Sequence, residues 1–505
     1  MKEKIVNLIA DHVEGMTAEE IATFIEIPPK QELGDYAFPC FRLAKTMHKA
    51  PNLIAADIKE AIGDVDFLDK IDVQGAYLNF FVKKDIFVQT MIEAALKDNF
   101  GGSDEGADKV ICIDYSSPNV AKNFHVGHLR TTIIGNSLYK IYSKLGYKVI
   151  RINHLGDWGT QFGKLIVAYK NWGTKEAVEK DGVAELMRLY VKFHEEADKN
   201  PELVDEARAW FSKMEHGDEE ALSIWQWFKD ISLVEYKRTY DLLGMDFDYY
   251  LGESFYRDKC QEVVDQLTNA NLLKESEGAM IVDLSDYDMA PCIVTKKDGS
   301  SIYATRDLAA IFYRKNTYHF TKCLYVTGQE QKLHFAQVFK VVELLGNDWA
   351  KDSLVHIPYG LVSLEGAKLS TRSGNIIYAE DILHDAIKKS FEIISEKSPN
   401  LPDKEEVAKI VGVGSVLFND LYNQRIKDVS FSWDKVLNFD GETGPYVQYT
   451  HARCSSVVRL AENFDPAKPV DYSTISEPDA MNLLKEINRF PKVVSDAAEK
   501  YEPSV

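Results

Sequence analysis

The sequence predicts a multidomain α/β protein whose largest domain is built on a doubly wound parallel sheet. Three observations predict this fold class. Two stretches of the chain each combine a short apolar run, a segment of helical periodicity and a second apolar run, which is the pattern of a βαβ unit. A long segment between these units has helical periodicity alone, and after Asp381 the pattern is almost wholly helical. A chain of 505 residues has room for about three domains.

The chain begins with a predicted small α+β domain. A turn at residues 33–38 enters an apolar segment, two helical patterns follow, and residues 77–82 form a predicted strand. The glycine-rich segment 100–107 is the clearest linker in the sequence. Three domains are predicted. Residues 1–100 form a small α+β domain, residues 101–380 form a sheet domain with a helical insertion at about 165–244, and residues 381–505 form an all-α domain.

The first βαβ unit follows the linker. Residues 110–113 are apolar and suit a buried strand, residues 127–145 carry apolar side chains at three- and four-residue spacings, and residues 148–152 are a second apolar run. The Pro-Asn pair at 118–119 separates the first strand from the helix. The tetrapeptide His125-Val-Gly-His128 therefore lies where the helix begins.

The paired histidines are a candidate phosphate site. A helix N-terminus presents unpaired N–H groups and a partial positive charge, which suits a phosphate. Two imidazoles can donate hydrogen bonds to phosphate oxygens, and Gly127 would let a flat ring approach the backbone closely. The alternative is that the histidines cap the helix or bind a metal. No Cys, Asp or Glu lies beside them at ligand spacing, which lowers the case for zinc.

The middle of the chain contains a polar loop, the helical insertion and the second βαβ unit. Residues 153–163 are dense in glycine, aromatic and polar residues, as in a binding loop, although a plain turn-rich connection stays open. Residues 300–306 are predicted to contain a short strand. The second unit is predicted as strand, helix and strand at residues 322–327, 332–345 and 353–357.

Two such units with an inserted region predict a Rossmann-like doubly wound sheet, which binds ligands beyond the carboxyl ends of its strands. The histidine pair and residues 329–331 would both lie on that edge. A further loop, residues 364–375, combines glycines with Lys368 and Arg372. A mobile cationic loop can stabilise charge on transferring phosphates, although such surface loops are common.

Composition narrows the class of protein. Hydrophobic content of 45% and charged content of 27% are ordinary for a soluble globular protein. The six cysteines include no CxxC pair, which predicts reduced thiols in the cytoplasm rather than disulfides or structural zinc. The sequence shows neither a signal peptide nor an apolar run of membrane-spanning length.

The net charge of −20 argues against a nucleic-acid partner only if it is averaged over the chain. Residues 109–170 contain nine Lys and Arg against two acids, a local charge of +7, whereas residues 171–232 contain eight against fifteen, a local charge of −7. A basic region around the histidines suits a phosphate-rich ligand. For Lys140 and Lys144, a solvated helix face is the simpler interpretation.

Together these segments resemble a known family. His125-Val-Gly-His128 resembles the HIGH signature of class I aminoacyl-tRNA synthetases, and Lys368-Leu-Ser-Thr-Arg372 resembles a variant of their KMSKS loop. The surrounding sequence resembles arginyl-tRNA synthetases over nearly the whole chain. The blocks that carry this likeness, in chain order, are residues 33–38, 114–130, 153–163, 303–307 and 441–453.

The resemblance implies an arginine–tRNA ligase. Such an enzyme converts ATP and L-arginine to arginyl-adenylate and pyrophosphate, and then transfers arginine to the terminal ribose of tRNA(Arg). ATP is the implied substrate together with Mg²⁺, with no structural metal and no organic cofactor. The implied partners are tRNA(Arg), L-arginine and ATP, and the protein is expected to be a cytoplasmic monomer without membrane contact.

The resemblance also implies site residues. Gly127 would pack under adenine, and the phosphates of ATP and the transition state would be contacted by His125, His128, Lys122, Lys368 and Ser370. The guanidinium of the substrate offers five donors in a fixed fork and needs acids and planar acceptors. The implied arginine site comprises Asp114, Ser117, Pro118, Asn119, His128, Tyr303, Asp307 and Gln331. The alternative for the two aspartates is a surface or capping role.

One departure concerns the cationic loop. The family's loop usually carries a second lysine, and here that position is Thr371. Some similar enzymes with this substitution use a lysine just before the HIGH signature, a position that Lys122 matches. The hypothesis is that Lys122 supplies the missing transition-state cation, and the alternative is a solvated loop lysine.

For tRNA, the similar N-terminal domain reads the D-loop region, with Tyr77 and Asn79 at the matching positions. An ordinary strand face is an equal alternative for that pair. In the helical C-terminal region, which resembles an anticodon-binding domain, the implied tRNA contacts are Tyr446, Gln448, Tyr449 and Arg453. The family's last domain continues well beyond Val505, so this chain is expected to end within it.

Two rival functions remain open at this level. A nucleotidylyltransferase of the same superfamily would also place paired histidines at a helix start, but it would need neither the arginine site nor the long helical tail. A non-catalytic tRNA-binding relative would lose His128, Lys368 or Asp307, and all three are present.

Overall fold

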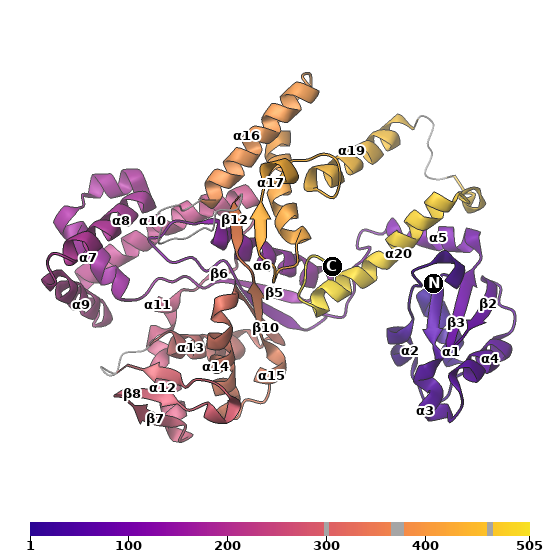
Figure 1. Ribbon diagram of the computed structural model, residues 1–505, viewed down its shortest axis with the longest axis horizontal. Helices are drawn as coiled ribbons and strands as arrows, with labels where there is room; N and C mark the ends of the chain where they lie inside the picture. Colours follow the sequence, from indigo (N-terminus) through magenta and orange to yellow (C-terminus); the bar gives the residue numbers. More distant parts are fainter. Residues whose placement is uncertain (297–301, 365–377, 462–467) are drawn as a thin grey trace. The chain divides into compact units, whose positions relative to one another are not determined.

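Figure 1 shows the computed structural model of the chain, which describes residues 1–296, 302–364, 378–461 and 468–505. The chain forms two compact units. The first comprises Met1–Ser103 and Glu462–Asp496, and the second comprises Asp104–Ala461 and Ala497–Val505.

The first unit is a three-stranded antiparallel sheet covered by helices, with strand order β1-β3-β2. Its central strand matches the predicted strand at residues 77–82. The inward side chains of that strand, Leu78, Phe80 and Val82, pack with Ile54 and Ile58 in one core. The elements are α1 (Lys2–Ala10), α2 (Ala18–Phe24), β1 (Tyr36–Pro39), α3 (Ala44–Met47), α4 (Pro51–Ile62), β2 (Leu68–Gln74), β3 (Tyr77–Val82), α5 (Lys84–Ala95) and most of α20 (Pro478–Glu499).

The second unit is built on a five-stranded, all-parallel sheet with strand order β11-β10-β4-β5-β6. Both predicted βαβ units are confirmed within one or two residues. The first is β4 (Val110–Asp114), α6 (Val126–Lys144) and β5 (Lys148–Asn153), and the second is β10 (Lys322–Gly328), α14 (Lys332–Leu344) and β11 (Leu354–Tyr359). The edge strand β6 (Tyr249–Tyr250), which lies just after the insertion, was not predicted.

The order of the strands explains where a ligand can lie. The first unit runs outward from β4 to β5, and the second runs in the opposite direction from β10 to β11. Because parallel crossovers are right-handed, the helices α6 and α14 cover opposite faces of the sheet. The winding therefore reverses between the paired strands β4 and β10, and in such sheets ligands bind beyond the carboxyl ends of the strands at this point.

The segment between β5 and β6 is helical, as predicted. It comprises α7 (Thr160–Trp172), α8 (Lys175–Ala197), α9 (Glu202–Glu215) and α10 (Glu219–Leu243), drawn in purple and magenta in Figure 1. These helices share a core of their own that includes Trp158, Phe162, Trp210 and Phe228. Helices α7 and α9 approach closely at Gly163, where a Cβ would lie 2.0 Å from the carbonyl oxygen of Ala207.

The chain between β6 and β11 contributes a second lobe, which packs against the sheet. It contains α11 (Glu253–Tyr256), α12 (Cys260–Asn269), a three-stranded antiparallel sheet of β7 (Leu273–Ser276), β8 (Ala279–Val282) and β9 (Cys292–Thr295), α13 (Tyr303–Tyr318) and α15 (Ala350–Ser353).

A short strand was predicted at residues 300–306. For residues 302–306, which the structure describes, that prediction is wrong. Tyr303 begins helix α13. The β-branched and aromatic residues here suggested a strand, but Ala304, Leu308 and Ile311 recur at helical spacing and are all buried. Burial of that helical stripe outweighs the local strand propensity.

The region after residue 378 is mainly helical, as predicted, with one exception. Strand β13 (Val429–Phe431) pairs in parallel with β12 (Val362–Leu364), which lies far earlier in the chain. The helices are α16 (Ala379–Lys397), α17 (Lys404–Tyr422), α18 (Trp433–Val436) and α19 (Gly444–Leu460). None of the helices in the described ranges combines the length and the apolar character needed to span a lipid bilayer. All six cysteines are free thiols.

Candidate functional site

The candidate site lies at the carboxyl edge of the parallel sheet. His125 is the N-cap of α6, and its Nδ1 accepts a hydrogen bond from the N–H of Gly127 at 3.1 Å. The Nδ1 of His128 accepts the N–H of His125 at 3.3 Å. The two rings stack with their centroids 3.9 Å apart. Capping, which was the alternative interpretation of the pair, is therefore combined with a fixed orientation of both rings.

The same hydrogen bonds determine the proton positions on the two rings. Burial lowers the pKa of His125, and the charge of Lys122 lowers it further. Burial, His125 and Lys122 together hold the pKa of His128 well below its ordinary value. Each ring is therefore neutral near pH 7 and, because its Nδ1 accepts, carries its proton on Nε2. Two Nε2–H donors beside a helix N-terminus suit phosphate oxygens.

The backbone between β4 and α6 is strained. Three non-glycine residues have positive φ: Ser116 at 72°, Ser117 at 44° and Ala121 at 60°. Buried hydrogen bonds hold this conformation, since the hydroxyl of Ser116 lies 2.7 Å from those of Tyr240 and Thr132. Strain of about 1–3 kcal/mol per residue persists only where surrounding contacts enforce it, and it is concentrated at functional sites.

Asp114 lies at the end of β4 and already has a cationic partner. Nη2 of Arg314, which is fully buried in α13, lies 2.7 Å from its carboxylate. The same carboxylate accepts the hydroxyl of Ser117 at 2.9 Å, and Nδ1 of His154 lies 4.0 Å away. Arg314 therefore neutralises Asp114 from within the protein, and Ser117 is oriented by the pair. The sequence interpretation singled out neither Arg314 nor His154.

Asp307 has a different environment in the first turns of α13. Its Oδ2 lies 2.6 Å from Nε2 of His334. Burial opposes ionisation of Asp307, but the hydrogen bond and charge of His334 lower the pKa of Asp307 overall. An ionised, half-buried carboxylate at the sheet edge can accept a cationic ligand.

Glu253 is an acidic residue that the sequence interpretation missed. It begins α11, directly after β6, and lies 2.9 Å from Nε of Arg306. Burial and, to a smaller extent, the nearby charges of Asp307 and Asp157 raise the pKa of Glu253 to about 8, against the opposing effect of Arg306. A carboxyl group with this pKa becomes ionised when a second cation approaches. The signal that could have found it is its place after a strand, but that strand has only two residues.

The other predicted arginine-site residues lie in α13, in the segment after β10 and in the loop after β4. Tyr303 is 64% exposed, with its ring 5.3 Å from the guanidinium carbon of Arg306. Gln331 is exposed at the end of a short 3-10 helix after β10. Pro118 is buried, and the side chain of Asn119 lies against Gly156, where a Cβ would meet Asn119 Oδ1 at 2.0 Å.

Lys122 is exposed in the loop just before the histidines, close enough for its charge to lower both of their pKa values. The four loop residues Lys368, Ser370, Thr371 and Arg372 lie outside the described residues. The described end of that loop meets the histidine segment: Tyr378 forms a β-bridge with His125, and the N–H of Ala379 donates to Phe124 at 3.0 Å.

The predicted tRNA contacts lie in two places. In the first unit, Tyr77 packs edge-on against Phe41, whereas Asn79 is only 3% exposed. Phe41, which is 44% exposed beside Tyr77, was not predicted. In the second unit, Tyr446, Tyr449 and Arg453 of α19 are exposed, whereas Gln448 is half-buried. Gln448 donates to the carbonyl of Ile410 at 3.2 Å, and the guanidinium of Arg453 lies 5.7 Å from the ring of Tyr449.

Among the residues that the structure describes, no three His, Cys, Asp or Glu side chains are grouped so as to hold a metal ion.

Residues 90–433 match a family described as tRNA synthetases class I (R), catalytic domain. Residues 2–82 match the arginyl tRNA synthetase N terminal domain, and residues 447–505 match the DALR anticodon binding domain.

Individual proteins show the same likeness. The arginine–tRNA ligase of Alkaliphilus metalliredigens (strain QYMF) is 56% identical over 506 residues, which cover 100% of this chain and 89% of the relative. That of Clostridioides difficile (strain 630) is 54% identical with the same coverage. The solved arginyl-tRNA synthetase of Thermus thermophilus shares the fold, with a TM-score of 0.82 at 24% identity, covering 100% of this chain and 89% of that one.

Proposed function

The chain belongs to the family of class I arginyl-tRNA synthetases, and from this premise we propose how its residues divide the two steps of arginine–tRNA ligation. It is an arginine–tRNA ligase. The observation that carries the function is identity above 50% along the full chain. The neutral, stacked histidines at the start of α6 support the proposed chemistry.

In the first step, a carboxylate oxygen of arginine attacks the α-phosphorus of ATP. A P–O bond forms, the bond to the β,γ-diphosphate breaks, and arginyl-adenylate and pyrophosphate result. In the second step, a hydroxyl of the terminal tRNA ribose attacks the arginyl carbonyl, and AMP leaves. Such in-line displacement at phosphorus depends mainly on positioning and charge stabilisation.

We assign the phosphates to the first turn of α6. The Nε2–H groups of His125 and His128 donate to phosphate oxygens, and Gly127 lies under adenine. Lys122 and, from the cationic loop, Lys368 neutralise the charge that develops on pyrophosphate, and the hydroxyl of Ser370 donates a hydrogen bond to it. Mg²⁺ enters as part of the ATP substrate.

We assign the arginine side chain to the acids beside α13. Asp307 and Glu253 receive the guanidinium, with Tyr303 alongside it. Asp114 is already neutralised by Arg314, so its role is to orient Ser117. The amino and carboxylate groups of the substrate are held by Ser117, Pro118, Asn119, His128 and Gln331.

We also propose the roles of the outer regions. Residues 1–100 contact the D-loop side of tRNA(Arg) through Tyr77 rather than through the buried Asn79. Residues 101–380 perform the chemistry, and the helical region from residue 381 binds the anticodon side. There the contacts are Tyr446, Gln448, Tyr449 and Arg453. The protein acts as a monomer in the cytoplasm.

The test is ATP–pyrophosphate exchange against each amino acid, with and without tRNA. We expect exchange with arginine and with no other amino acid, and only when tRNA(Arg) is present. Exchange with another amino acid in place of arginine would overturn the assignment. RNA binding without any exchange would favour a non-catalytic tRNA-binding protein.

The role of Lys122 predicts a kinetic defect. Replacing Lys122 with alanine should lower the rate of adenylate formation by about 100-fold, because a preorganised charge at the reacting phosphates is lost. Pre-steady-state pyrophosphate release measures this rate. Lys140→Ala, which removes an exposed lysine from the same region, is the control and should leave the rate unchanged. An unchanged rate in Lys122→Ala, with activity abolished in Lys368→Ala, would assign the cationic role to the loop alone.

The raised pKa of Glu253 predicts that arginine binding releases a proton. At pH 7 the free carboxyl group, with a pKa of about 8, is mostly protonated, and a bound guanidinium would lower that pKa and displace the proton. Affinity for arginine should therefore rise by up to about tenfold per pH unit below pH 8 and level off above it. Calorimetry in buffers of different ionisation enthalpy measures the release. Glu253→Gln should bind with little pH dependence, and a flat profile in the unaltered protein would contradict the prediction.

A further inference from the structure

Arg130 is a buried charge that neither step above uses. It lies two residues after His128 in α6, and its relative exposure is 1%. Two residues correspond to about 200° of helical rotation, so Arg130 faces away from the histidines and toward the helical region. An arginine at this depth loses its hydration and needs specific partners in exchange.

Those partners come from three separate segments. Nη1 of Arg130 donates to the carbonyl oxygen of Leu361 at 3.3 Å, and Nη2 donates to the carbonyl oxygens of Arg425 and Lys427, both at 3.0 Å. Nε lies 3.5 Å from Oδ1 of Asp420. One side chain thereby connects α6 to the start of β12, to α17 and to the turn that leads into β13.

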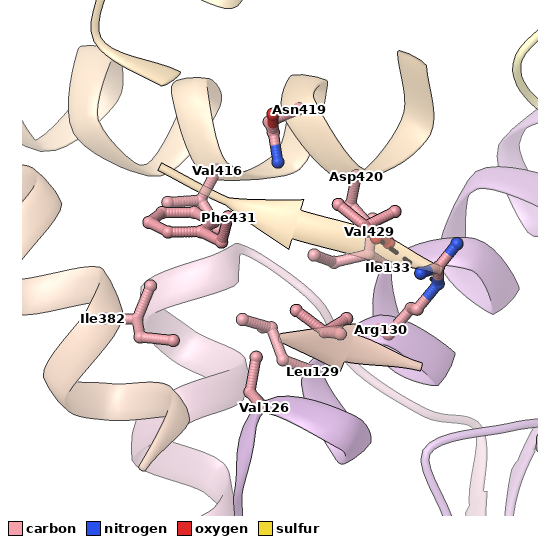
Figure 2. Close-up of a pocket in the computed structure, with 11 residues that line it drawn as sticks. Val126, Leu129, Arg130, Ile133, Ile382, Val416, Asn419, Asp420, Val429 and Phe431 are labelled. Carbon is pink, nitrogen blue, oxygen red and sulfur yellow. Dashed lines mark ion pairs between the residues drawn. The ribbon is translucent and has the colours of Figure 1, made fainter. Parts of the chain in front are cut away.

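Figure 2 shows this ion pair at one end of a cavity of about 20 Å³ between α6 and α17. The rest of the lining is largely apolar and includes Val126, Leu129 and Val416. Burial raises the pKa of Asp420 to about 6, against the opposing effect of Arg130. A charge pair in such surroundings has few alternative partners, so a displaced Arg130 cannot easily be accommodated elsewhere.

The start of α6 has a second attachment to the helical region. His125 forms a β-bridge with Tyr378, and the N–H of Ala379, the first residue of α16, donates to the carbonyl of Phe124 at 3.0 Å. Helix α6 is thus held at its N-cap by α16 and, less than two turns later, at Arg130 by α17 and the β12–β13 pair. Two attachments fix both the position of α6 along its axis and its rotation about that axis. A single attachment would leave the rotation free.

We propose that Arg130 is a positioning residue for adenylate formation, which fixes the rotation of α6 and hence the direction in which His125 and His128 donate. The inference rests on the proposed function, because it concerns the first of the two steps. The planar guanidinium is required, since the single nitrogen of a lysine cannot serve three carbonyls and a carboxylate from one place. A misplacement of about 1 Å at reacting groups can cost about 100-fold in rate.

The experiment compares three variants with the unaltered protein: Arg130→Lys, Arg130→Met and the double variant Arg130→Met/Asp420→Leu. The control is Arg151→Met, which removes another paired arginine of the same unit, one that contacts Asp248 at 2.7 Å. Each protein is measured by thermal unfolding, by arginine binding in the absence of ATP and by kcat and KM in ATP–pyrophosphate exchange, with kcat expressed per titrated active site.

We expect Arg130→Lys and Arg130→Met to lower kcat by about 100-fold while arginine binding changes less than about twofold. The double variant removes both charges and should recover thermal stability without recovering kcat, because stability and positioning are separate effects. Arg151→Met should retain kcat. Normal kcat in Arg130→Lys, or recovery of kcat together with stability in the double variant, would overturn the inference. Failure of the unaltered protein to exchange with arginine would instead overturn the proposed function.

Discussion

Asp307→Asn is expected to lower kcat/KM for arginine in ATP–pyrophosphate exchange by about 1000-fold, mainly through KM. The substitution keeps the size of the side chain but removes the ionised acceptor that His334 holds in place at 2.6 Å. The bound guanidinium would then be buried against a neutral amide. Breaking one side of a buried ion pair costs about 3–5 kcal/mol, and each 1.4 kcal/mol corresponds to about tenfold in affinity.

The measurement is exchange kinetics at varied arginine and fixed ATP, combined with direct titration of arginine. Asp258→Asn is the matched control, because Asp258 is an exposed acid of the same lobe and pairs with its neighbour Arg257. KM for ATP should be unchanged in both variants. A fall in kcat with unchanged arginine affinity would show that Asp307 acts through His334 rather than on the substrate.

His128→Ala is expected to lower kcat for adenylate formation by about 1000-fold. Two functions are lost at once. The Nδ1 of His128 no longer accepts the N–H of His125 at the start of α6, and the Nε2–H donor to phosphate disappears. Arginine binding in the absence of ATP should weaken far less than kcat, since the acids beside α13 are intact and only the contact of His128 with the amino and carboxylate groups of arginine is lost.

Single-turnover pyrophosphate release measures this effect, and His216→Ala, at an exposed histidine of the insertion, is the control. The pH profile provides a second criterion. Because burial lowers the pKa of both active-site histidines, the rate should not fall as pH drops through about 6.5, the usual histidine value, but only at lower pH. A rate loss centred at 6.5 would contradict the neutral state assigned to the rings.

The elements that could be predicted from sequence are those with a strong periodic signal. Residues 127–145 and 332–345 show several turns of helical spacing, and their flanking apolar runs lie in the central sheet. Strand β2, of seven residues, was also not predicted, and it pairs with the neighbouring β3. The other unpredicted strands include β6, β12 and β13, which have two or three residues each. They exist because a distant segment offers a partner, and a window of local sequence contains no trace of that partner.

The candidate site divides in the same way. His125, His128 and Asp307 belong to compact sequence blocks, so their importance could be inferred. Arg314 could not, because its burial depends on Asp114, which lies 200 residues earlier in the chain and pairs with it at the end of β4. Glu253 was missed for a related reason, since the strand that delivers it is too short to detect.

The left-handed backbone at Ser116, Ser117 and Ala121 bears on how this enzyme can change over evolutionary time. Glycine adopts such angles freely, so a mutation such as Ala121→Gly would relieve strain in the folded protein but would also loosen the segment that leads into the paired histidines. Selection for heat resistance and selection for fast turnover would therefore act in opposite directions on this loop, and a lineage adapting to a new growth temperature would meet that conflict here.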